Sequence, residues 1–262
     1  MNHIRRLFLA AAMAVIATAG AGQAAAAKPE PREVLVFGGT GQLGAEIVRR
    51  LLVQGDRVTV FTRPGSDRSR LTGLAVGYVE GDLLNEADVT AAFAGKPFRY
   101  VIVAVRVEDA DPHFYAKFLP GLTARAKAAG VVQLIHHGAV GAGRNAEKFQ
   151  DLGWEKVPGL LDRLKDQGVG EDIVRASGVP WTIIRNTRLY PDGTPPTGKA
   201  ELTEDDSVIG PMTRADLAVL TLRCLGNAGC LGRTWHVRDP SLAWPPPKAP
   251  GPESPVGAAA GK

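Results

Sequence analysis

The sequence predicts a single α/β domain built on a doubly wound parallel sheet. Short apolar runs rich in β-branched residues alternate with stretches of helical periodicity through the first half of the chain, as strands joined by crossover helices do. The first run, 34–37, leads directly into a glycine-rich turn, as is typical where such a sheet binds a ligand. The chain of 262 residues, 45% of them hydrophobic and 22% charged, is long enough for one substantial core.

The first strand, the turn after it and the helix expected over 45–52 predict a dinucleotide site. The turn satisfies the spacing G-x-G-x-x-G from Gly39. One glycine permits the tight turn, one lets the backbone approach a pyrophosphate, and one lets the helix pack closely on the strand. The N-terminus of that helix then points at the negative charge. The cofactor-binding residues predicted here are Gly38, Thr40, Gly41, Gln42, Leu43 and Gly44.

The other elements continue the alternation of strands and helices. Apolar content, turn signals and helix stops place each of them. Strands are predicted at 57–62, 75–80, 100–105, 131–136, 181–185 and 234–237, and helices at 86–94, 114–129, 160–176 and from about 213.

The end of the second strand indicates which dinucleotide binds. An Asp or Glu at this position bonds the ribose 2′-hydroxyl of NAD, whereas an arginine accommodates the 2′-phosphate of NADP. This chain has Thr62 and Arg63 there, with Arg68 and Arg70 nearby and no carboxylate at the strand end. NADP (NADPH) is therefore the predicted cofactor. The alternative is that these arginines belong to a solvated basic loop.

Two further strand ends complete the predicted cofactor site, because the carboxyl ends of parallel strands meet at one edge. Asp82 and Leu83 follow the third strand, where Asp82 either bonds an adenine amine or closes its own turn. Val103 and Ala104 lie near the end of the fourth strand. The loop 106–112 carries several carboxylates, but their spacing matches no metal-ligand pattern, so no metal site is predicted.

These motifs together resemble the short-chain dehydrogenase/reductase superfamily, specifically its atypical branch of NmrA-like and NAD(P)H-binding proteins. The resemblance rests on the glycine turn, the end of the second strand, and the runs 81–83, 176–185 and 213–218. It extends over about residues 34–237. It implies a Rossmann-like fold and hydride transfer to or from a small organic substrate.

The resemblance also shows that the usual catalytic positions are replaced. Catalytically active relatives carry a serine after the fifth strand, and a tyrosine and a lysine on the next helix. Together these residues transfer a proton to or from the substrate. Here Gly138 or Ala139 stands at the serine position. Aligning Glu171 with the family's glutamate places Arg163 and Gln167 at the tyrosine and lysine positions.

The catalytic residues are therefore unknown from the sequence, with His137 as the best-placed candidate. It is expected to end the fifth strand on the ligand edge, and histidine exchanges a proton near neutral pH. Alternation along the strand points His136 and His137 to opposite faces, so at least one of them packs structurally. The segment 190–198, rich in proline and glycine, is the expected substrate-side loop.

Two functions of different classes stay open. The first is an NADP-dependent oxidoreductase acting on a small organic substrate. The second is a non-catalytic sensor or assembly factor that holds NADP(H), which the replaced positions favour. A sugar-nucleotide epimerase is a weaker alternative, because it needs the same tyrosine and lysine. The formal charge of +4, without a basic face interleaved with aromatic residues, argues against nucleic acid as a partner.

Residues 1–27 predict a secretory signal, with a basic start, an apolar stretch and small residues before an A-x-A cleavage site at 24–26. The run Arg5-Arg6-Leu7-Phe8-Leu9 resembles a twin-arginine signal, which predicts export to the bacterial periplasm. The apolar stretch is shorter than the roughly 20 residues of a membrane span, so no stable span is expected. An uncleaved membrane anchor is the alternative.

The C-terminal part holds the chain's two cysteines and a tail of biased composition. Cys224 and Cys230 are too few for a disulfide framework or a metal cluster, and either a local disulfide or two free thiols fits their spacing. Proline, glycine and alanine predominate toward the C-terminus and predict a disordered tail over 241–262. The nucleotide-binding domain is accordingly expected over 33–240.

Overall fold

A computed structural model describes residues 30–106 and 111–244 of the chain. The contacts group the described residues from Pro31 onward into one unit. The predicted signal segment 1–27, residues 245–262 of the predicted tail, and Glu108 and Asp109 of the acidic loop lie outside the described residues.

An eight-stranded sheet lies at the centre of this unit, in the order β3-β2-β1-β4-β5-β6-β8-β7. All neighbouring strands pair in parallel except β7, which runs antiparallel to β8 at the edge. The chain order reverses between β1 and β4, which confirms the doubly wound sheet. The strands are β1 (Glu33–Phe37), β2 (Arg57–Thr62), β3 (Gly77–Glu80), β4 (Tyr100–Val103), β5 (Gln133–Ala139), β6 (Trp181–Asn186), β7 (Glu201–Thr203) and β8 (Arg233–Arg238).

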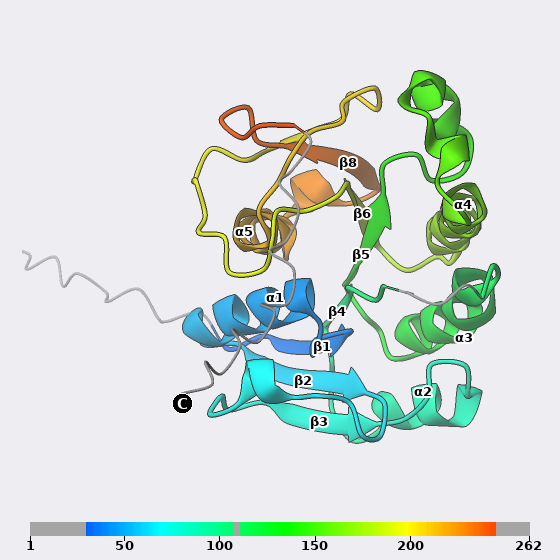
Figure 1. Ribbon diagram of the computed structural model, residues 1–262. Coiled ribbons are helices and arrows are strands. Elements are labelled where there is room, and N and C mark those ends of the chain that lie inside the picture. Colours follow the sequence, from blue (N-terminus) through cyan, green and yellow to red (C-terminus); the bar gives the residue numbers. More distant parts are fainter. Residues whose placement is uncertain (1–29, 107–110, 245–262) are drawn as a thin grey trace, which may run out of the picture. The chain divides into compact units, whose positions relative to one another are not determined.

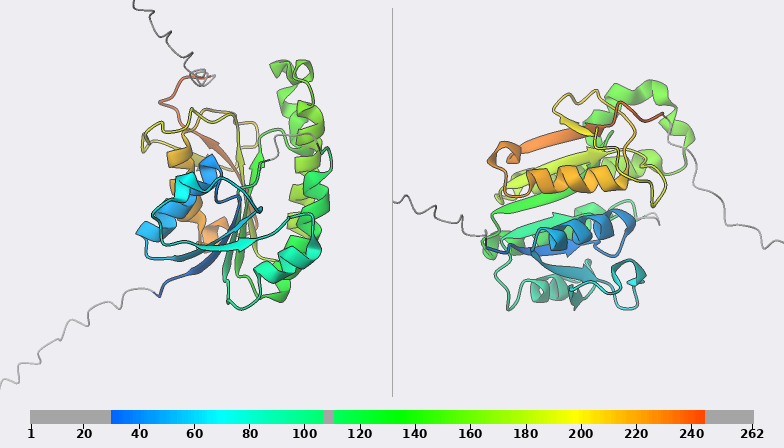
Figure 2. Two further views of the ribbon diagram at one scale, coloured as in Figure 1. Left: turned by 60° about the horizontal axis from the view of Figure 1, so that its bottom comes forward. Right: turned by 90° about the vertical axis from the view of Figure 1, so that its left-hand side faces the viewer.

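Helices cover both faces of the sheet, with α1 and α5 on one face and α2, α3 and α4 on the other (Figures 1 and 2). Burial on both faces explains why the strands read as nearly continuous apolar runs rather than as alternating patterns. The helices are α1 (Gln42–Val53), α2 (Glu86–Ala92), α3 (Phe114–Ala128), α4 (Leu160–Ala176) and α5 (Arg214–Cys224), with short 3-10 segments η1 (Ser69–Leu71), η2 (Gly143–Leu152), η3 (Trp154–Lys156) and η4 (Ala228–Cys230).

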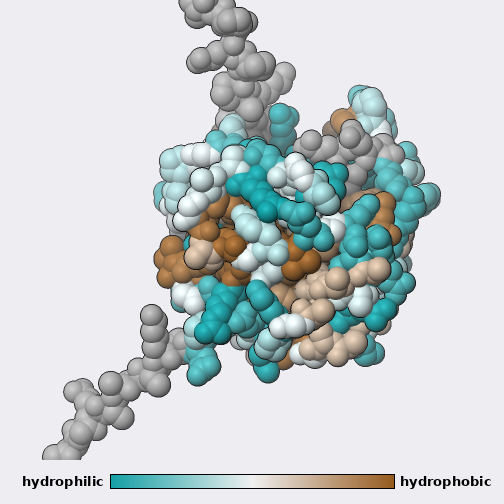
Figure 3. Space-filling view, turned by 90° about the horizontal axis from the view of Figure 1, so that it is seen from below, coloured by the Kyte–Doolittle hydropathy of each residue, from teal (hydrophilic) through white to brown (hydrophobic). Residues whose placement is uncertain are grey.

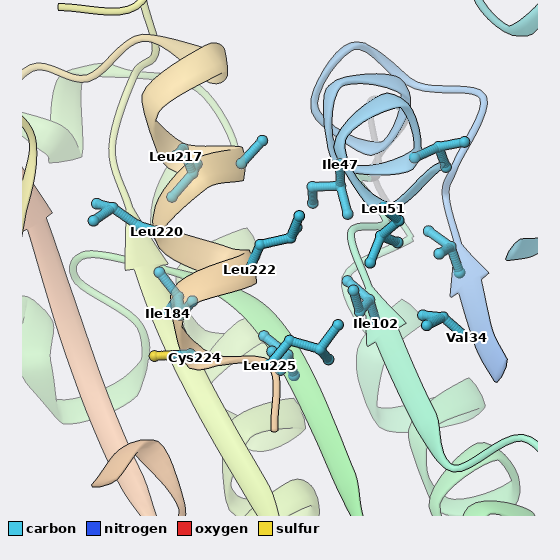
Figure 4. Packing of buried hydrophobic residues seen from close by; sticks show 14 of the residues in the cluster. Val34, Ile47, Leu51, Ile102, Ile184, Leu217, Leu220, Leu222, Cys224 and Leu225 are labelled. Carbon is cyan, nitrogen blue, oxygen red and sulfur yellow. The ribbon is translucent and has the colours of Figure 1, made fainter. Parts of the chain in front are cut away.

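The sheet separates two hydrophobic clusters. In one of them Leu222 of α5 points toward Ile47 and Leu51 of α1, and the two helices pack side by side over the sheet (Figure 4). The other cluster joins Phe37 and Phe118 beneath α2, α3 and α4. Packing on both faces fixes the positions of the strands, so their carboxyl ends line up along one edge of the sheet. The predicted site lies at this edge.

The structure extends and corrects the predicted elements at several places. The strand predicted at 131–136 becomes β5, which starts later and continues to Ala139, because Gly138 and Ala139 pair with β6. The sequence did not predict β7, whose three residues form the edge of the sheet. A disulfide joins Cys224 and Cys230, so the alternative of two free thiols is wrong for this structure.

Within residues 30–106 and 111–244, no helix has both the length and the apolar content needed to cross a bilayer. The face seen from below in Figure 1 shows separate hydrophobic patches among hydrophilic residues (Figure 3).

Candidate functional site

The turn after β1 packs so closely that only glycine fits at several positions. Gly38 adopts φ +80°, and a Cβ there would lie 2.5 Å from the carbonyl oxygen of Ala104. A Cβ at Gly44 would lie 2.1 Å from the carbonyl oxygen of Gly38, and one at Gly39 would lie 2.7 Å from a methyl group of Val60. The turn therefore lies against β2 and β4, and α1 starts directly above the end of β1.

The N-terminus of α1 leaves backbone donors available at this turn. Gly41 caps the helix without a side-chain hydrogen bond, and the first turn holds no acidic residue. The amides of Gln42, Leu43 and Gly44 occupy helix positions that have no acceptor within the helix. Free amides and the positive end of the helix dipole together suit an anion such as a pyrophosphate. The glycine turn thus fits the pyrophosphate of a dinucleotide.

The other predicted cofactor residues lie along the same edge of the sheet. Phe37, the last residue of β1, is in register with Phe61 of β2 and with Val103 of β4, and Thr62 is in register with Glu80 of β3. The parallel register brings together the strand ends that carry the predicted residues. These are Thr62, Arg63, Asp82, Leu83, Val103 and Ala104, beside the point where the strand order reverses.

The three arginines after β2 differ in the contacts that their side chains make. Arg68 stacks over the ring of Tyr78 at 4.3 Å and pairs with Glu80. Arg70 pairs with Asp192 at 3.3 Å. Arg63 is exposed and has no ion-pair partner among the residues that the structure describes. Of the three, Arg63 alone is therefore free to bind a ligand phosphate without breaking an existing contact.

Asp82 performs a local structural role, whether or not it also binds a ligand. Its Oδ1 accepts a hydrogen bond from the amide of Leu84 at 2.9 Å, and its own amide donates to Asp88 at 2.8 Å. The carboxylate thereby closes the turn after β3, as the alternative interpretation expected. Its second oxygen has no hydrogen-bond partner in the described part of the chain, and the side chain stays exposed at the ligand edge.

His137 does not lie where the sequence placed it. Since β5 continues to Ala139, His137 lies inside the strand rather than at its end, and it is 5% exposed. Its Nε2 lies 3.2 Å from the hydroxyl of Thr221 on α5. His136 points to the opposite face, where its ring lies 5.9 Å from that of Tyr115. The expectation of opposite faces is confirmed, whereas the expected position at the ligand edge is wrong.

Burial also keeps both histidines uncharged near neutral pH. It lowers the pKa of His136 to about 4, with a smaller contribution from the charge of Arg175. It lowers the pKa of His137 to about 3, with a smaller contribution from His136. A neutral imidazole that is enclosed in the core is poorly suited to donate a proton to a substrate. The geometry gives the candidate role of His137 no support.

These two pKa shifts predict that the fold loses stability in acid. Below about pH 6.5 the unfolded chain protonates both histidines while the folded chain keeps them neutral, so protons favour unfolding. We expect a loss of about 2 kcal/mol per histidine between pH 7 and pH 5, measured by urea unfolding at both values. His136→Leu should remove the share of about 2 kcal/mol that His136 contributes, and the exposed-site control His113→Gln should retain the full dependence. An undiminished pH dependence in His136→Leu would contradict the prediction.

A buried ion pair fills the space beside the position where relatives carry a serine. A Cβ added at Gly138 would lie 2.4 Å from Oε1 of Glu171. That carboxylate is fully buried and accepts hydrogen bonds from Arg185, the shortest at 2.6 Å, and from Arg175 at 2.8 Å. From the sequence, Glu171 serves only as an alignment landmark, and this ion pair is not predicted. A glutamate on a helix and an arginine that ends an apolar strand were the available signals.

The residues at the other two replaced positions lie on the first turns of α4. Arg163 is partly exposed, and Gln167 is partly buried with its Oε1 lacking a hydrogen-bond partner within the described residues. Neither side chain supplies an ionisable group with the proton affinity of a tyrosine or a lysine amine. The described site therefore contains the elements of a dinucleotide cradle without the usual proton-transfer set.

The chain is similar to a known family and to curated proteins over much of its length. A family model described as NAD(P)H-binding matches residues 38–228, which is most of the chain. Sterol demethylase protein B of Methylococcus capsulatus is 35% identical over 130 residues, covering 47% of this chain and 40% of that protein. The chain thus spans less than half the length of that relative. The (4-alkanoyl-5-oxo-2,5-dihydrofuran-3-yl)methyl phosphate reductase of Streptomyces griseus is 26% identical over 213 residues, covering 79% of this chain and 68% of that enzyme.

Solved structures share the fold over most of the chain. An anaerobillin reductase from Escherichia coli O157:H7 superposes with a TM-score of 0.68 at 21% identity, covering 80% of this chain and 98% of that one. A short-chain dehydrogenase/reductase from Veillonella parvula in complex with NADP also reaches 0.68, at 16% identity, covering 84% of this chain and 100% of that one. At these identities the likeness concerns the fold alone.

Proposed function

Because the chain belongs to the NAD(P)H-binding, reductase-like branch of the atypical short-chain dehydrogenases/reductases, we propose that it binds NADP(H) and transfers hydride to or from a small organic substrate. The observation that carries this proposal is the glycine cradle at the start of α1, where a Cβ at Gly44 would strike the backbone of Gly38. The amides of the first turn of α1 would hold the pyrophosphate. The bound cofactor would supply the hydride.

The choice of NADP rests on Arg63. It is exposed, lies at the end of β2 and is free of ion pairs within the described part of the chain, whereas Arg68 and Arg70 already have partners. Its planar guanidinium matches the geometry of the 2′-phosphate. No carboxylate stands at this strand end to bond a ribose 2′-hydroxyl in its place.

Binding titrations with NADPH and NADH test this proposal. We expect the wild-type protein to bind NADPH more tightly than NADH, and Arg63→Gln to weaken NADPH binding by about 10- to 100-fold, since one charge-assisted contact is lost. NADH binding should not change. Arg57→Gln, at the opposite end of the same strand, is the matched control and should leave both affinities as they are. Equal affinity of the wild type for the two cofactors would exclude the role of Arg63, and absence of binding to both would exclude the function.

A second function is favoured by the ion pair at Gly138. The carboxylate of Glu171 fills the space that a serine side chain would need, and Arg163 and Gln167 replace the proton-transfer residues of the family. A protein that holds NADP(H) as a sensor or assembly factor needs none of these groups. Single-turnover oxidation of bound NADPH against a panel of quinones and aldehydes distinguishes the two. Turnover supports the oxidoreductase, and silence across the panel favours the sensor.

We further propose export to the periplasm through the signal predicted at residues 1–27. The disulfide between Cys224 and Cys230 supports this proposal independently of the signal pattern, because such bridges persist in oxidising compartments. Both cysteines are buried, so the bridge joins the end of α5 to η4 inside the structure. Cell fractionation of the tagged full chain should recover the processed protein in the periplasm, and Arg5→Lys together with Arg6→Lys should retain it in the cytoplasm. Export of that double variant at the normal rate would exclude the twin-arginine route.

A further inference from the structure

The segment that follows β4 lies directly against the glycine turn. The amide of Ala104 donates to the carbonyl oxygen of Phe37, the last residue of β1, at 2.9 Å. A Cβ at Gly38 would lie 2.8 Å from the carbonyl carbon of Ala104 and 3.0 Å from the amide nitrogen of Val105. Because the two backbones are in contact, a shift of residues 104–105 would be transmitted to the glycine turn.

The hydroxyl of Tyr115 on α3 holds this segment in place. It donates a hydrogen bond to the carbonyl oxygen of Val105 at 2.8 Å. Tyr115 is 4% exposed, and its ring centroid lies 5.6 Å from that of Phe118. Burial raises the pKa of the Tyr115 hydroxyl, and the charge of Asp166 raises it further, against an opposing effect of Arg106. The hydroxyl therefore stays protonated at neutral pH and remains a donor.

A buried carboxylate on α4 in turn fixes the position of Tyr115. Asp166 is 4% exposed, and its two oxygens accept hydrogen bonds from the amides of Tyr115 at 2.8 Å and Ala116 at 3.2 Å. These amides belong to the first turn of α3, whose N-cap residue His113 provides no side-chain hydrogen bond. The carboxylate also lies at the positive end of the helix dipole. Asp166 therefore caps α3 from a neighbouring helix.

A glycine at position 170 lets α4 approach closely enough for this contact. Helices α3 and α4 lie side by side on one face of the sheet (Figures 1 and 2). A Cβ at Gly170 would lie 2.8 Å from the Cβ of Tyr115 and 2.8 Å from a methyl group of Leu119. Asp166 and Gly170 are four positions apart, so they share the face of α4 that contacts α3. Glycine inside a helix normally destabilises it, and here it permits the packing that brings Asp166 to the start of α3.

We propose that Tyr115 and Asp166 are positioning residues for the nicotinamide half of the dinucleotide. This inference rests on the proposed function. In the sheet order, the end of β2 with Arg63 lies on one side of β1 and its glycine turn, and the end of β4 with residues 104–105 lies on the other. Since Arg63 is proposed to bind the 2′-phosphate on the adenosine half, the nicotinamide half extends across β1 toward the end of β4. Asp166 fixes Tyr115, and Tyr115 fixes Val105 beside that half.

Tyr115→Phe tests the proposal in the full chain, because it removes the hydroxyl and keeps the ring. We expect its affinity for NADPH to fall by about 3- to 10-fold, which corresponds to the loss of one neutral hydrogen bond. The affinity for adenosine 2′,5′-bisphosphate, which lacks the nicotinamide half, should not change. Thr123→Val is the matched control, since it removes another buried hydroxyl of α3, one that donates to the carbonyl oxygen of Leu119 at 2.8 Å. It should keep both affinities at the wild-type values.

Variants of Asp166 provide a second comparison. Asp166→Ala should reproduce the selective loss of NADPH affinity, because the first turn of α3 loses its acceptor. Asp166→Asn should lose less, since its amide oxygen still accepts a hydrogen bond. Far-UV circular dichroism establishes that each variant folds. If Asp166→Ala does not fold, Tyr115→Phe and Asp166→Asn carry the test.

Amide hydrogen exchange of the full chain without cofactor tests the contact by itself. The amide of Ala104 should exchange faster in Tyr115→Phe than in the wild type or in Thr123→Val, because Val105 is no longer held. Unchanged exchange, wild-type NADPH affinity in folded Tyr115→Phe, or an equal loss of affinity for NADPH and the bisphosphate would overturn this inference and leave the proposed function intact. Absence of NADPH and NADH binding by the wild type would instead exclude the proposed function, and the inference with it.

Discussion

Gly44→Ala is expected to abolish dinucleotide binding, with the affinities for both NADPH and NADH falling at least 100-fold. A Cβ at this position would lie 2.1 Å from the carbonyl oxygen of Gly38 and 2.7 Å from the Cα of Gly39. Both neighbours are backbone atoms, so relief requires α1 to move away from β1. That movement withdraws the helix amides from the pyrophosphate, which loses several hydrogen bonds at once.

Fluorescence titration with each cofactor measures this effect, beside far-UV circular dichroism to establish that the variant folds. Gly121→Ala is the matched control, because a Cβ there would meet its nearest neighbour, a side-chain carbon of Glu86, at 3.9 Å. Gly41→Ala is a milder variant of the same turn, with 3.3 Å to the oxygen of Gly38, and should lose less affinity. A folded Gly44→Ala protein that binds cofactor as the wild type does would exclude the glycine cradle as the pyrophosphate site.

Glu171→Ala is expected to lower the free energy of unfolding by about 3–5 kcal/mol. The substitution leaves the guanidinium of Arg185 buried without its carboxylate, and Arg185 is 8% exposed. Removing one member of a buried ion pair lowers the free energy of unfolding by far more than the intact pair adds to it, because the remaining charge is buried without a counterion. Glu171→Gln should cost less, since the amide still accepts a hydrogen bond.

Urea unfolding at pH 7 measures the loss. Glu204→Ala is the matched control, because Glu204 pairs with Arg233 on the surface and both side chains are about half exposed. Surface pairs contribute little, so we expect a change of less than about 1 kcal/mol there. Similar losses in the two variants would contradict the assignment of Glu171 as a buried structural anion.

The ion pair of Glu171 also explains why no residue larger than glycine fits at position 138 of this chain. The carboxylate lies against Gly138, so a larger residue at that position would displace it from Arg185. Sequence comparison identified the replaced position, yet it gave no reason for the glycine. The reason is a contact between Gly138 of β5 and Glu171 of α4, two residues that lie more than 30 positions apart in the chain. Such long-range contacts leave no local pattern in the sequence.

The dependence on long-range contacts also explains why His137 was wrongly predicted to end the fifth strand. The apolar run ending at the histidines is typical of a strand that stops there, and small residues such as Gly138 and Ala139 do not extend that pattern. In the structure these two residues continue the strand, because β6 offers them backbone partners at Arg185 and Asn186. Pairing with a neighbouring strand decides where a strand ends, and the neighbour arrives from a distant part of the chain.

By itself, the sequence determined the doubly wound sheet, the glycine turn and the strand ends that surround it, since local periodicity and glycine spacing report directly on strands, helices and tight turns. It did not determine which arginine after β2 lacks an ion-pair partner among the described residues, whether Cys224 and Cys230 are bridged, or what occupies the space beside Gly138. Only the tertiary structure decided these points. Each depends on side chains brought together from separate elements, and the distances between such side chains are set by packing rather than by position along the chain.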